Sequence, residues 1–242
     1  MFCVRSLVLL FAASAFAFES PVAFAGFTSA FPWGPAGWES NPARAESALA
    51  ASAWWRGSGP SERAASFTAG FESPHLGGAF VYDLYALDST FRQTYVLLEA
   101  SVAFWKLRAG AAWGPVAEWV VGDAVWLRYR AKFGLLGRFG SFVLSSWWTG
   151  FLDEEPAFPR FGISWESSGS FAAFAVADAE SVSVGTFARF GCVSVYSTYV
   201  FPGFGFEIGI SFAWGGLSVG AGHGMRGEMG DWNGVWAMKG IR

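Results

Sequence analysis

One stretch of the sequence decides the fold, and at residues 204–214 it reads FGFEIGISFAW. Large apolar side chains occupy every even position, whereas glycine, serine, alanine or Glu207 occupies each odd position between them. Successive side chains of a β-strand point to opposite faces, so this pattern predicts a strand with one apolar face. In a helix the large side chains would surround the axis, and the glycines would destabilise its interior.

The same period of two returns at 94–104, 106–113, 125–135 and 160–166. In the stretch WLRYRAKFGLLG at 126–137, apolar and cationic side chains alternate. One face holds Leu127, Tyr129, Ala131, Phe133 and Leu135, and the other holds Arg128, Arg130 and Lys132. A cation that faces lipid at the membrane midplane costs about 2–4 kcal/mol. The alternation therefore predicts apolar residues facing lipid and cations facing the inside of a barrel.

The composition favours an apolar environment outside the protein. Hydrophobic residues make up 53% of the 242-residue chain and aromatic residues 19%, whereas charged residues make up only 14%. Ordinary soluble domains carry roughly 25% charged residues, and one core of this size does not easily bury so many rings. The net charge of −3 argues against a nucleic-acid partner.

Residues 1–25 are predicted to be an export signal. A short basic start with Arg5 precedes the apolar run LVLLFAASAFAF, which is too short to span a bilayer as a helix. Small residues offer cleavage after Ala17 or Ala25, of which Ala25 is favoured, and an uncleaved anchor is the alternative. Cys192 is then the only cysteine of the mature chain, so no internal disulfide and no cysteine-based metal site is expected.

The segments between turn signals predict an all-β, antiparallel transmembrane barrel of about 14 strands, with 12 as the alternative if the weaker segments at 170–189 merge. Short turns are expected at 121–123, 137–140, 167–170, 202–203 and 215–216, and a medium connection at 73–77. The predicted strands are 47–55, 63–71, 78–87, 91–104, 106–119, 124–135, 140–151, 159–167, 170–178, 181–189, 191–201, 204–214, 216–223 and 232–240.

Many tryptophans lie near the predicted strand ends, where an indole places its apolar body in lipid and its N–H in the wet interface. This pattern predicts interfacial aromatic girdles. The tryptophans concerned are Trp54, Trp55, Trp105, Trp113, Trp119, Trp126, Trp214, Trp232 and Trp236.

No catalytic set stands out, and neither enzymatic activity, nor a metal, nor a cofactor is expected. The only histidines, His75 and His223, lack a partner pattern typical of catalysis. The predicted inner face instead carries charges of both signs. They either line a pore or anion site, or form a charge network that fills the barrel and holds an inner plug. The set is Asp83, Glu99, Arg108, Arg128, Arg130, Lys132, Arg160, Glu166 and Glu207.

The segment GPAGWESNPARAESALA at 34–50 contains the element Asn41-Pro42-Ala43 just before the first predicted strand. In this respect the chain resembles the FadL/PorV-like outer-membrane barrels. The resemblance implies a 14-stranded barrel with an N-terminal inner segment. Residues 26–46 would then be a barrel plug that carries Asn41, Pro42 and Ala43, and residues 47–242 would form the barrel.

Three functions remain open at this level. The first is an outer-membrane channel or transporter for small or hydrophobic molecules in a Gram-negative-type bacterium. The second is a non-transport anchor or shuttle barrel of a secretion or surface-attachment system. The third is a soluble secreted β-sandwich that binds carbohydrate. The expected partners are outer-membrane lipid, a small or hydrophobic solute and, for the second function, secretion-system proteins.

Overall fold

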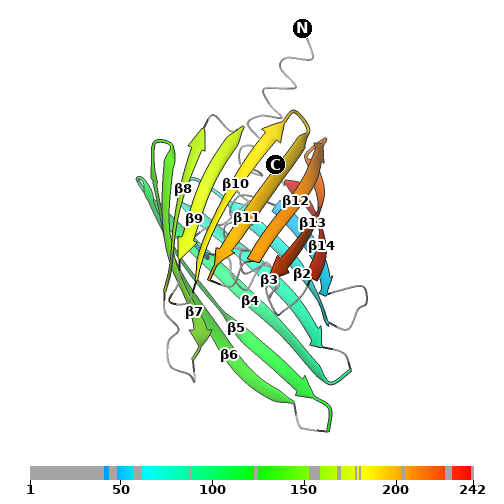
Figure 1. The fold of residues 1–242 in the computed structure, drawn as a ribbon. Helices are drawn as coiled ribbons and strands as arrows, with labels where there is room; N and C mark the ends of the chain where they lie inside the picture. The colour runs from blue at the N-terminus through cyan, green and yellow to red at the C-terminus, as the bar shows by residue number, and fades with distance from the viewer. Residues whose placement is uncertain are drawn as a thin grey trace.

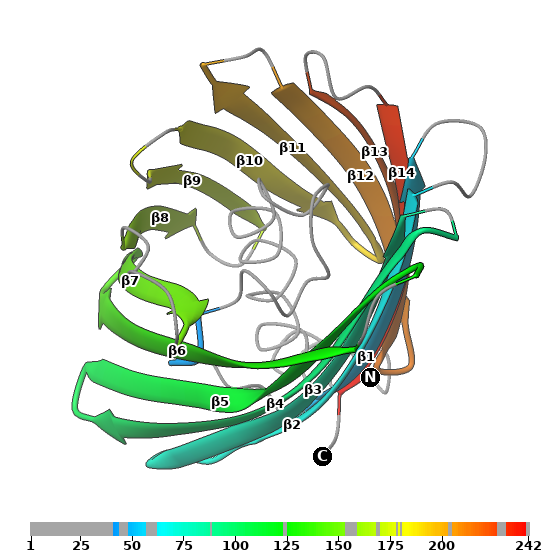
Figure 2. The same cartoon turned by 90° about the horizontal axis from the view of Figure 1, so that it is seen from below.

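The computed structural model is a single closed antiparallel barrel (Figures 1 and 2). It describes residues 41–43, 48–56, 62–87, 89–122, 125–152, 159–167, 170–177, 179, 181–202, 205–226 and 231–240. The strands are β1 (Ala48–Arg56), β2 (Glu62–Glu72), β3 (Leu76–Leu87), β4 (Phe91–Phe104), β5 (Leu107–Val120), β6 (Trp126–Phe139), β7 (Phe142–Phe151), β8 (Arg160–Ser167), β9 (Phe171–Ala177), β10 (Val182–Phe190), β11 (Val193–Phe201), β12 (Gly205–Trp214), β13 (Leu217–Arg226) and β14 (Asp231–Gly240).

Each strand pairs with its neighbours in sequence, and β1 closes the barrel against β14 with Ala48 opposite Gly240. Closure leaves no open sheet edge, which is what a membrane-spanning sheet requires. The predicted fold class and the count of 14 strands are therefore confirmed. The 12-strand alternative is wrong, because β9 and β10 are separate paired strands. The β-sandwich alternative is also wrong, because the sheet closes on itself.

The two faces of each strand differ as the alternation predicts. On β4, Leu98 is 62% exposed on the outer face, while its neighbour Leu97 on the inner face is fully buried. On β6, Phe133 is 55% exposed and Lys132 is fully buried. Ala131 lies in the outward row of β6 but is buried, because the large Trp113 lies opposite it in register.

Several predicted connections are shifted or shortened in the structure. The end of the barrel that holds the start of β1 and the end of β14 is called the terminal end, and the opposite end the loop end. At the terminal end Gly140 and Ser141 form the turn predicted at 137–140, since residues 137–139 still belong to β6. The connection predicted at 73–77 is shorter, because the Ser73 N–H already bonds the Leu76 carbonyl at 2.7 Å.

Four connections at the terminal end are two-residue hairpins, the tightest links between antiparallel strands. Three of them begin with Gly140, Gly191 and Gly215, whose φ angles of 64°, 64° and 58° are readily adopted by glycine. The fourth begins with Trp105 at a φ of 57°. This end therefore has short, tightly closed turns.

The barrel is taller on one side. β4, β5 and β6 each contain 14 residues, whereas β9 contains 7. The long strands reach beyond the others at the loop end, which is the lower end in Figure 1. Within the described residues, no helix has the length and apolarity needed to cross a membrane.

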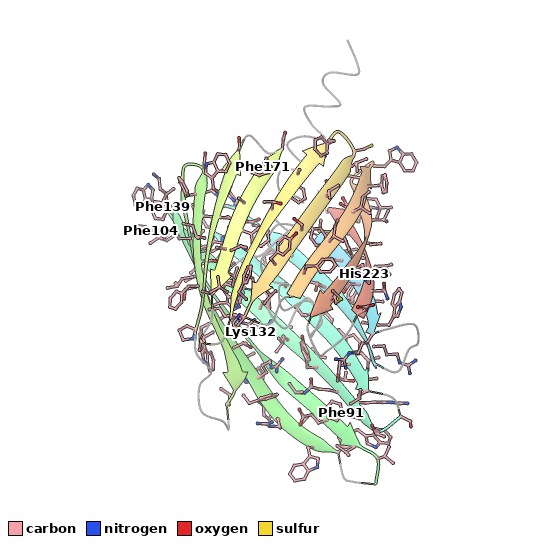
Figure 3. The ribbon with its side chains drawn as sticks, viewed as in Figure 1. Phe91, Phe104, Lys132, Phe139, Phe171 and His223 are labelled. Carbon is pink, nitrogen blue, oxygen red and sulfur yellow. The ribbon has the colours of Figure 1, made fainter. Side chains whose placement is uncertain are left out.

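Aromatic side chains gather near both ends. Figure 3 shows Phe104, Phe139 and Phe171 toward the terminal end and Phe91 toward the loop end. One of the tryptophans assigned to the girdles is placed differently. Trp236 packs against Tyr196 on the inner face of the barrel, with ring centroids 5.8 Å apart, because its even position in β14 points inward.

A lipid-facing cation at mid-height is expected to destabilise this barrel strongly. Leu98→Arg should lower the free energy of unfolding by about 2–4 kcal/mol, whereas Val125→Arg, at the loop end, should lower it by about 0–1 kcal/mol. Urea unfolding in phospholipid vesicles, followed by tryptophan fluorescence, measures both. Equal losses in the two variants would contradict the assignment of Leu98 to the membrane midplane and of Val125 to the interface.

Candidate functional site: the inner faces of the barrel

The inner face of β4–β7 holds most of the buried charge. The Lys132 ammonium lies 3.7 Å from the Glu99 carboxylate, and their side chains are 0% and 6% exposed. Both residues point inward because they follow the parity opposite to the exposed apolar residues of β4 and β6. Attraction between opposite charges offsets part of the cost of removing each from water.

The two arginines of β6 lie against aromatic rings from neighbouring strands. The Arg128 guanidinium carbon is 3.9 Å from the centroid of the Phe151 ring. That of Arg130 lies 4.7 Å from the Phe151 ring and 5.5 Å from the Tyr95 ring. Cation–π contacts of this kind hold a guanidinium in place without neutralising its charge.

Two more polar pairs lie toward the ends of the same wall. At the terminal end Arg108 forms a 2.6 Å ion pair with Glu72 and donates a 3.2 Å hydrogen bond to the Ser73 carbonyl. Toward the loop end the Gln93 amide donates a 2.5 Å hydrogen bond to the Glu118 carboxylate. Polar pairs, of which two are ion pairs, thus follow this wall from the terminal end toward the loop end.

The remaining members of the predicted charged set lie elsewhere. Arg160 begins β8 and is half-buried, at an inward position opposite Trp147. Glu207 lies on β12 and is nearly fully buried. The side chains of Asp83 and Glu166 lie outside the described residues. The structure therefore brings Glu99, Arg128, Arg130 and Lys132 onto one wall and places Glu207 on another.

The inner face of β9–β14 carries an aromatic cluster that sequence reasoning missed. Phe174, Phe187 and Tyr196 are buried there with Ala172, and Trp236 packs against them. Three of these rings lie opposite a glycine on the paired strand. The pairs are Phe174 with Gly185, Tyr196 with Gly209, and Trp236 with Gly220.

Glycine at these positions leaves room for the rings. A Cβ added at Gly185 would overlap the Phe174 ring, and one added at Gly209 would overlap the Tyr196 ring. Aromatic rings lying over cross-strand glycines are a known means of pinning register in sheets. The sequence alone did not reveal these pairs, because they depend on which residue faces which across two strands.

Glu207 is the one acidic side chain on the described inner face of β9–β14. It is 2% exposed and interacts with Tyr196 from the adjacent strand. On β12 it follows Gly205 and precedes Gly209 on the inward side, so small residues surround it. Glu207 therefore places an acidic group beside the aromatic cluster on this inner face.

The peptide Asn41–Ala43 lies buried against the β5–β7 wall. The Asn41 side-chain amide donates to the backbone carbonyls of Leu135, at 3.0 Å, and Ser146, at 3.3 Å. Its side-chain oxygen accepts a 2.9 Å hydrogen bond from the Ala43 N–H. Asn41 therefore bonds to two adjacent strands and to its own chain at once.

A pair of glycines makes room for this peptide. Gly110 of β5 and Gly134 of β6 lie opposite each other in register. A Cβ at Gly134 would overlap the Asn41 side chain, and one at Gly110 would overlap the Pro42 carbonyl. The two glycines form a notch in the wall, called the glycine notch below, that accommodates the Asn-Pro-Ala element.

Comparison with solved structures supports the fold. The chain matches no protein-family model and no curated protein. It is similar to a solved structure described as the CymD monoaromatic hydrocarbon channel, with a TM-score of 0.64 and 13% identity over 88% of this chain and 94% of that one. It is also similar to the Acinetobacter baumannii outer membrane protein Omp33, with a TM-score of 0.54 and 14% identity over 81% and 98%.

These similarities concern the fold, which is that of outer-membrane β-barrels. The apolar outer face described above suits the same environment. Because no family model matches, the resemblance to the FadL/PorV-like barrels stays a prediction.

Filling the glycine notch should displace the Asn-Pro-Ala element. In a chain with Cys3→Ser and Cys192→Ser, Ala43→Cys places a thiol at a fully buried position that should react slowly with maleimide. Adding Gly110→Ala should make that thiol react at least tenfold faster, because a Cβ there overlaps the Pro42 carbonyl. Gly240→Ala is the control, since nothing lies within 4 Å of its Cβ position. Unchanged labelling in Gly110→Ala would contradict the notch.

Removing one member of the buried ion pair should cost more than removing both charges. Lys132→Met is expected to lower the free energy of unfolding by about 3 kcal/mol, because it leaves Glu99 buried beside an apolar group. Combining it with Glu99→Gln should recover part of this loss. Urea unfolding of the single variants and the double variant measures the coupling. A double variant that loses the sum of the single losses would argue against pairing.

Proposed function

We propose that the protein is an outer-membrane channel that passes small or hydrophobic molecules. The observation that carries this proposal is the aromatic cluster on the inner face of β9–β14. The three buried rings of this cluster are 1–6% exposed in the structure as it stands. Along a route opened beside them, they would give an apolar solute a surface for which water does not compete. A wall of apolar rings offers no favourable contact to a hydrated ion. The similar CymD structure is described as a monoaromatic hydrocarbon channel, which agrees with this substrate class.

The charged wall complements the aromatic one in this proposal. Arg128, Arg130 and Lys132 point inward from β6, and contacts with Phe151 and Glu99 hold them in position. They would keep polar groups or water ordered along one side of the route, while an apolar solute passes along the other. The alternative role of these charges, a network that holds an inner segment, fits the same contacts.

Residues 26–46 would gate this route as an inner plug. Only Asn41–Ala43 of this segment belong to the described residues, and they support the proposal through their burial and their bonds to β6 and β7. A segment fixed at the glycine notch and attached to β1 would have a defined place inside the barrel. Loss of the Asn41 hydrogen bonds would weaken that attachment.

Solute uptake tests the proposal directly. Cells of a Gram-negative host that produce the protein are expected to take up radiolabelled toluene faster than cells without it, and sucrose no faster. Phe187→Asn should reduce toluene uptake severalfold, because it puts an amide into the aromatic cluster. Trp214→Ala is the matched control, since this aromatic residue is 85% exposed on the outer face.

Two results would contradict the proposal. Uptake of neither solute, together with no conductance in planar bilayers, would argue against transport and favour the anchor or shuttle function. Uptake of sucrose and toluene to the same extent would argue for an unselective pore instead. In each case a heat-modifiable gel shift identifies variants that failed to form the barrel.

A further inference from the structure

The outward rows of the described strands carry few charges. Only Arg63, Arg92, Asp231 and Lys239 lie there, and every other outward position is apolar, small or uncharged. A cation facing lipid is costly unless it lies near an interface or meets an anion. The positions of the two arginines therefore require an explanation.

The two arginines lie on one row across adjacent strands. The register places Trp55 opposite Arg63, Arg63 opposite Ala86, Ala86 opposite Arg92, and Arg92 opposite Trp119. These five residues are called the arginine row. Arginine, alanine and arginine stand side by side in it, with a tryptophan at each end.

Burial shows how the two arginines sit. Ala86 faces outward, yet it is only 3% exposed. Its cross-strand neighbours are Arg63 and Arg92, and both of these residues are exposed. A long arginine stem can lie along an apolar neighbour while its charged end stays in water. The Arg92 guanidinium also lies 5.4 Å from the centroid of the Trp119 ring. The two arginines therefore flank Ala86 across β2–β4, and the Arg92 guanidinium leans toward Trp119 of β5.

The arginine row lies at the level of the lipid headgroups on the loop-end side. From Arg92 to Phe104 strand β4 runs roughly 40 Å at about 3.4 Å per residue. A strand tilt of roughly 45° leaves about 28 Å along the membrane normal, close to the ~25 Å apolar band of outer-membrane barrels. Figure 3 shows Phe104 and Phe91, the neighbour of Arg92, toward opposite ends of the barrel. Short turns are periplasmic in such barrels, so the loop end faces outside.

The arginine row carries two cations and no acidic residue. No carboxylate within the described residues pairs with Arg63 or Arg92. Two like charges held two strands apart beside a low-dielectric medium repel each other more strongly than they would in water. An anion between them would replace this repulsion by attraction, and it would accept hydrogen bonds from both guanidinium groups. A phosphate fits, because guanidinium groups bind its oxygens through parallel hydrogen bonds.

We propose that the arginine row binds the phosphate group of an anionic glycolipid in the outer leaflet. Arg63 and Arg92 hold the phosphate over Ala86, and Trp55 and Trp119 flank the headgroup at the interface. One rung toward the terminal end, Ala53 and Ala65 are small outward residues that leave room for the start of an acyl chain. The lipid is thereby fixed against β1–β5, apart from the solute route inside the barrel.

Native mass spectrometry of the full barrel tests this site. The protein is released from dodecyl maltoside micelles doped with rising amounts of bisphosphorylated lipid A, and the lipid-bound fraction is measured. The double variant Arg63→Gln/Arg92→Gln is expected to bind lipid A at least tenfold more weakly than the unchanged protein. Lys239→Gln, which removes an outward cation at the terminal end, should bind as the unchanged protein does. Higher salt should weaken binding to the unchanged protein and have little effect on the double variant.

Three outcomes would overturn the proposal. The first is a double variant with a normal heat-modifiable gel shift that binds lipid A as tightly as the unchanged protein. The second is an equal loss of binding in Lys239→Gln, which would mean general charge attraction. The third is equally tight binding of a phosphate-free analogue of the lipid, which would mean recognition of the acyl chains alone. Solute uptake is measured separately in the same variants, and it should stay unchanged.

Discussion

The structure depends on one constraint, which is that every backbone N–H and C=O within a membrane must find a hydrogen-bond partner inside the protein. In this chain the pairing of β1 with β14 meets that requirement by closing the sheet. Once the sheet is closed, each residue of a strand faces either lipid or the interior. In every strand, the period of two in the sequence therefore determines which side chains face lipid and which face the interior. It explains how a chain rich in aromatic residues can keep Lys132 and Glu99 fully or nearly fully buried inside.

Cross-strand glycines then shape the interior. Where a glycine lies opposite an aromatic residue, as Gly209 lies opposite Tyr196, the ring spreads over the missing side chain. Where two glycines lie opposite each other, as Gly110 and Gly134 do, the wall accepts a passing peptide instead. The same residue type thus builds an aromatic surface on one side of the barrel and a binding notch on the other. This division gives the proposed route for an apolar solute two chemically different walls.

The outer face is also determined by the alternation along each strand, but its side chains are mainly apolar. Charges are few on it, and the two arginines among them mark a level of the membrane and a place for an anion. Trp55 and Trp119 at the ends of the arginine row suit the same boundary, because an indole is stable where apolar and wet regions meet. In this view the barrel interacts with lipid through one defined contact and with solute through its interior, and the two interactions use opposite faces of the same strands.

The sequence by itself determined which face each residue takes, because parity along a strand is a local property. The alternation at 204–214 and 126–137, together with the apolar composition, predicted the barrel and the inward position of Arg130 and Lys132, and the turn signals between segments predicted about 14 strands. It did not determine register, because pairing between strands depends on turn length, closure and tilt together. For that reason the shift of the predicted turn to Gly140 and Ser141, the inward packing of Trp236 and the facing glycines Gly110 and Gly134 emerged only from the folded barrel. Arg63 and Arg92 lie far apart in the sequence, and only the tertiary structure placed them on either side of Ala86, because cross-strand neighbours are decided by the register of the closed sheet.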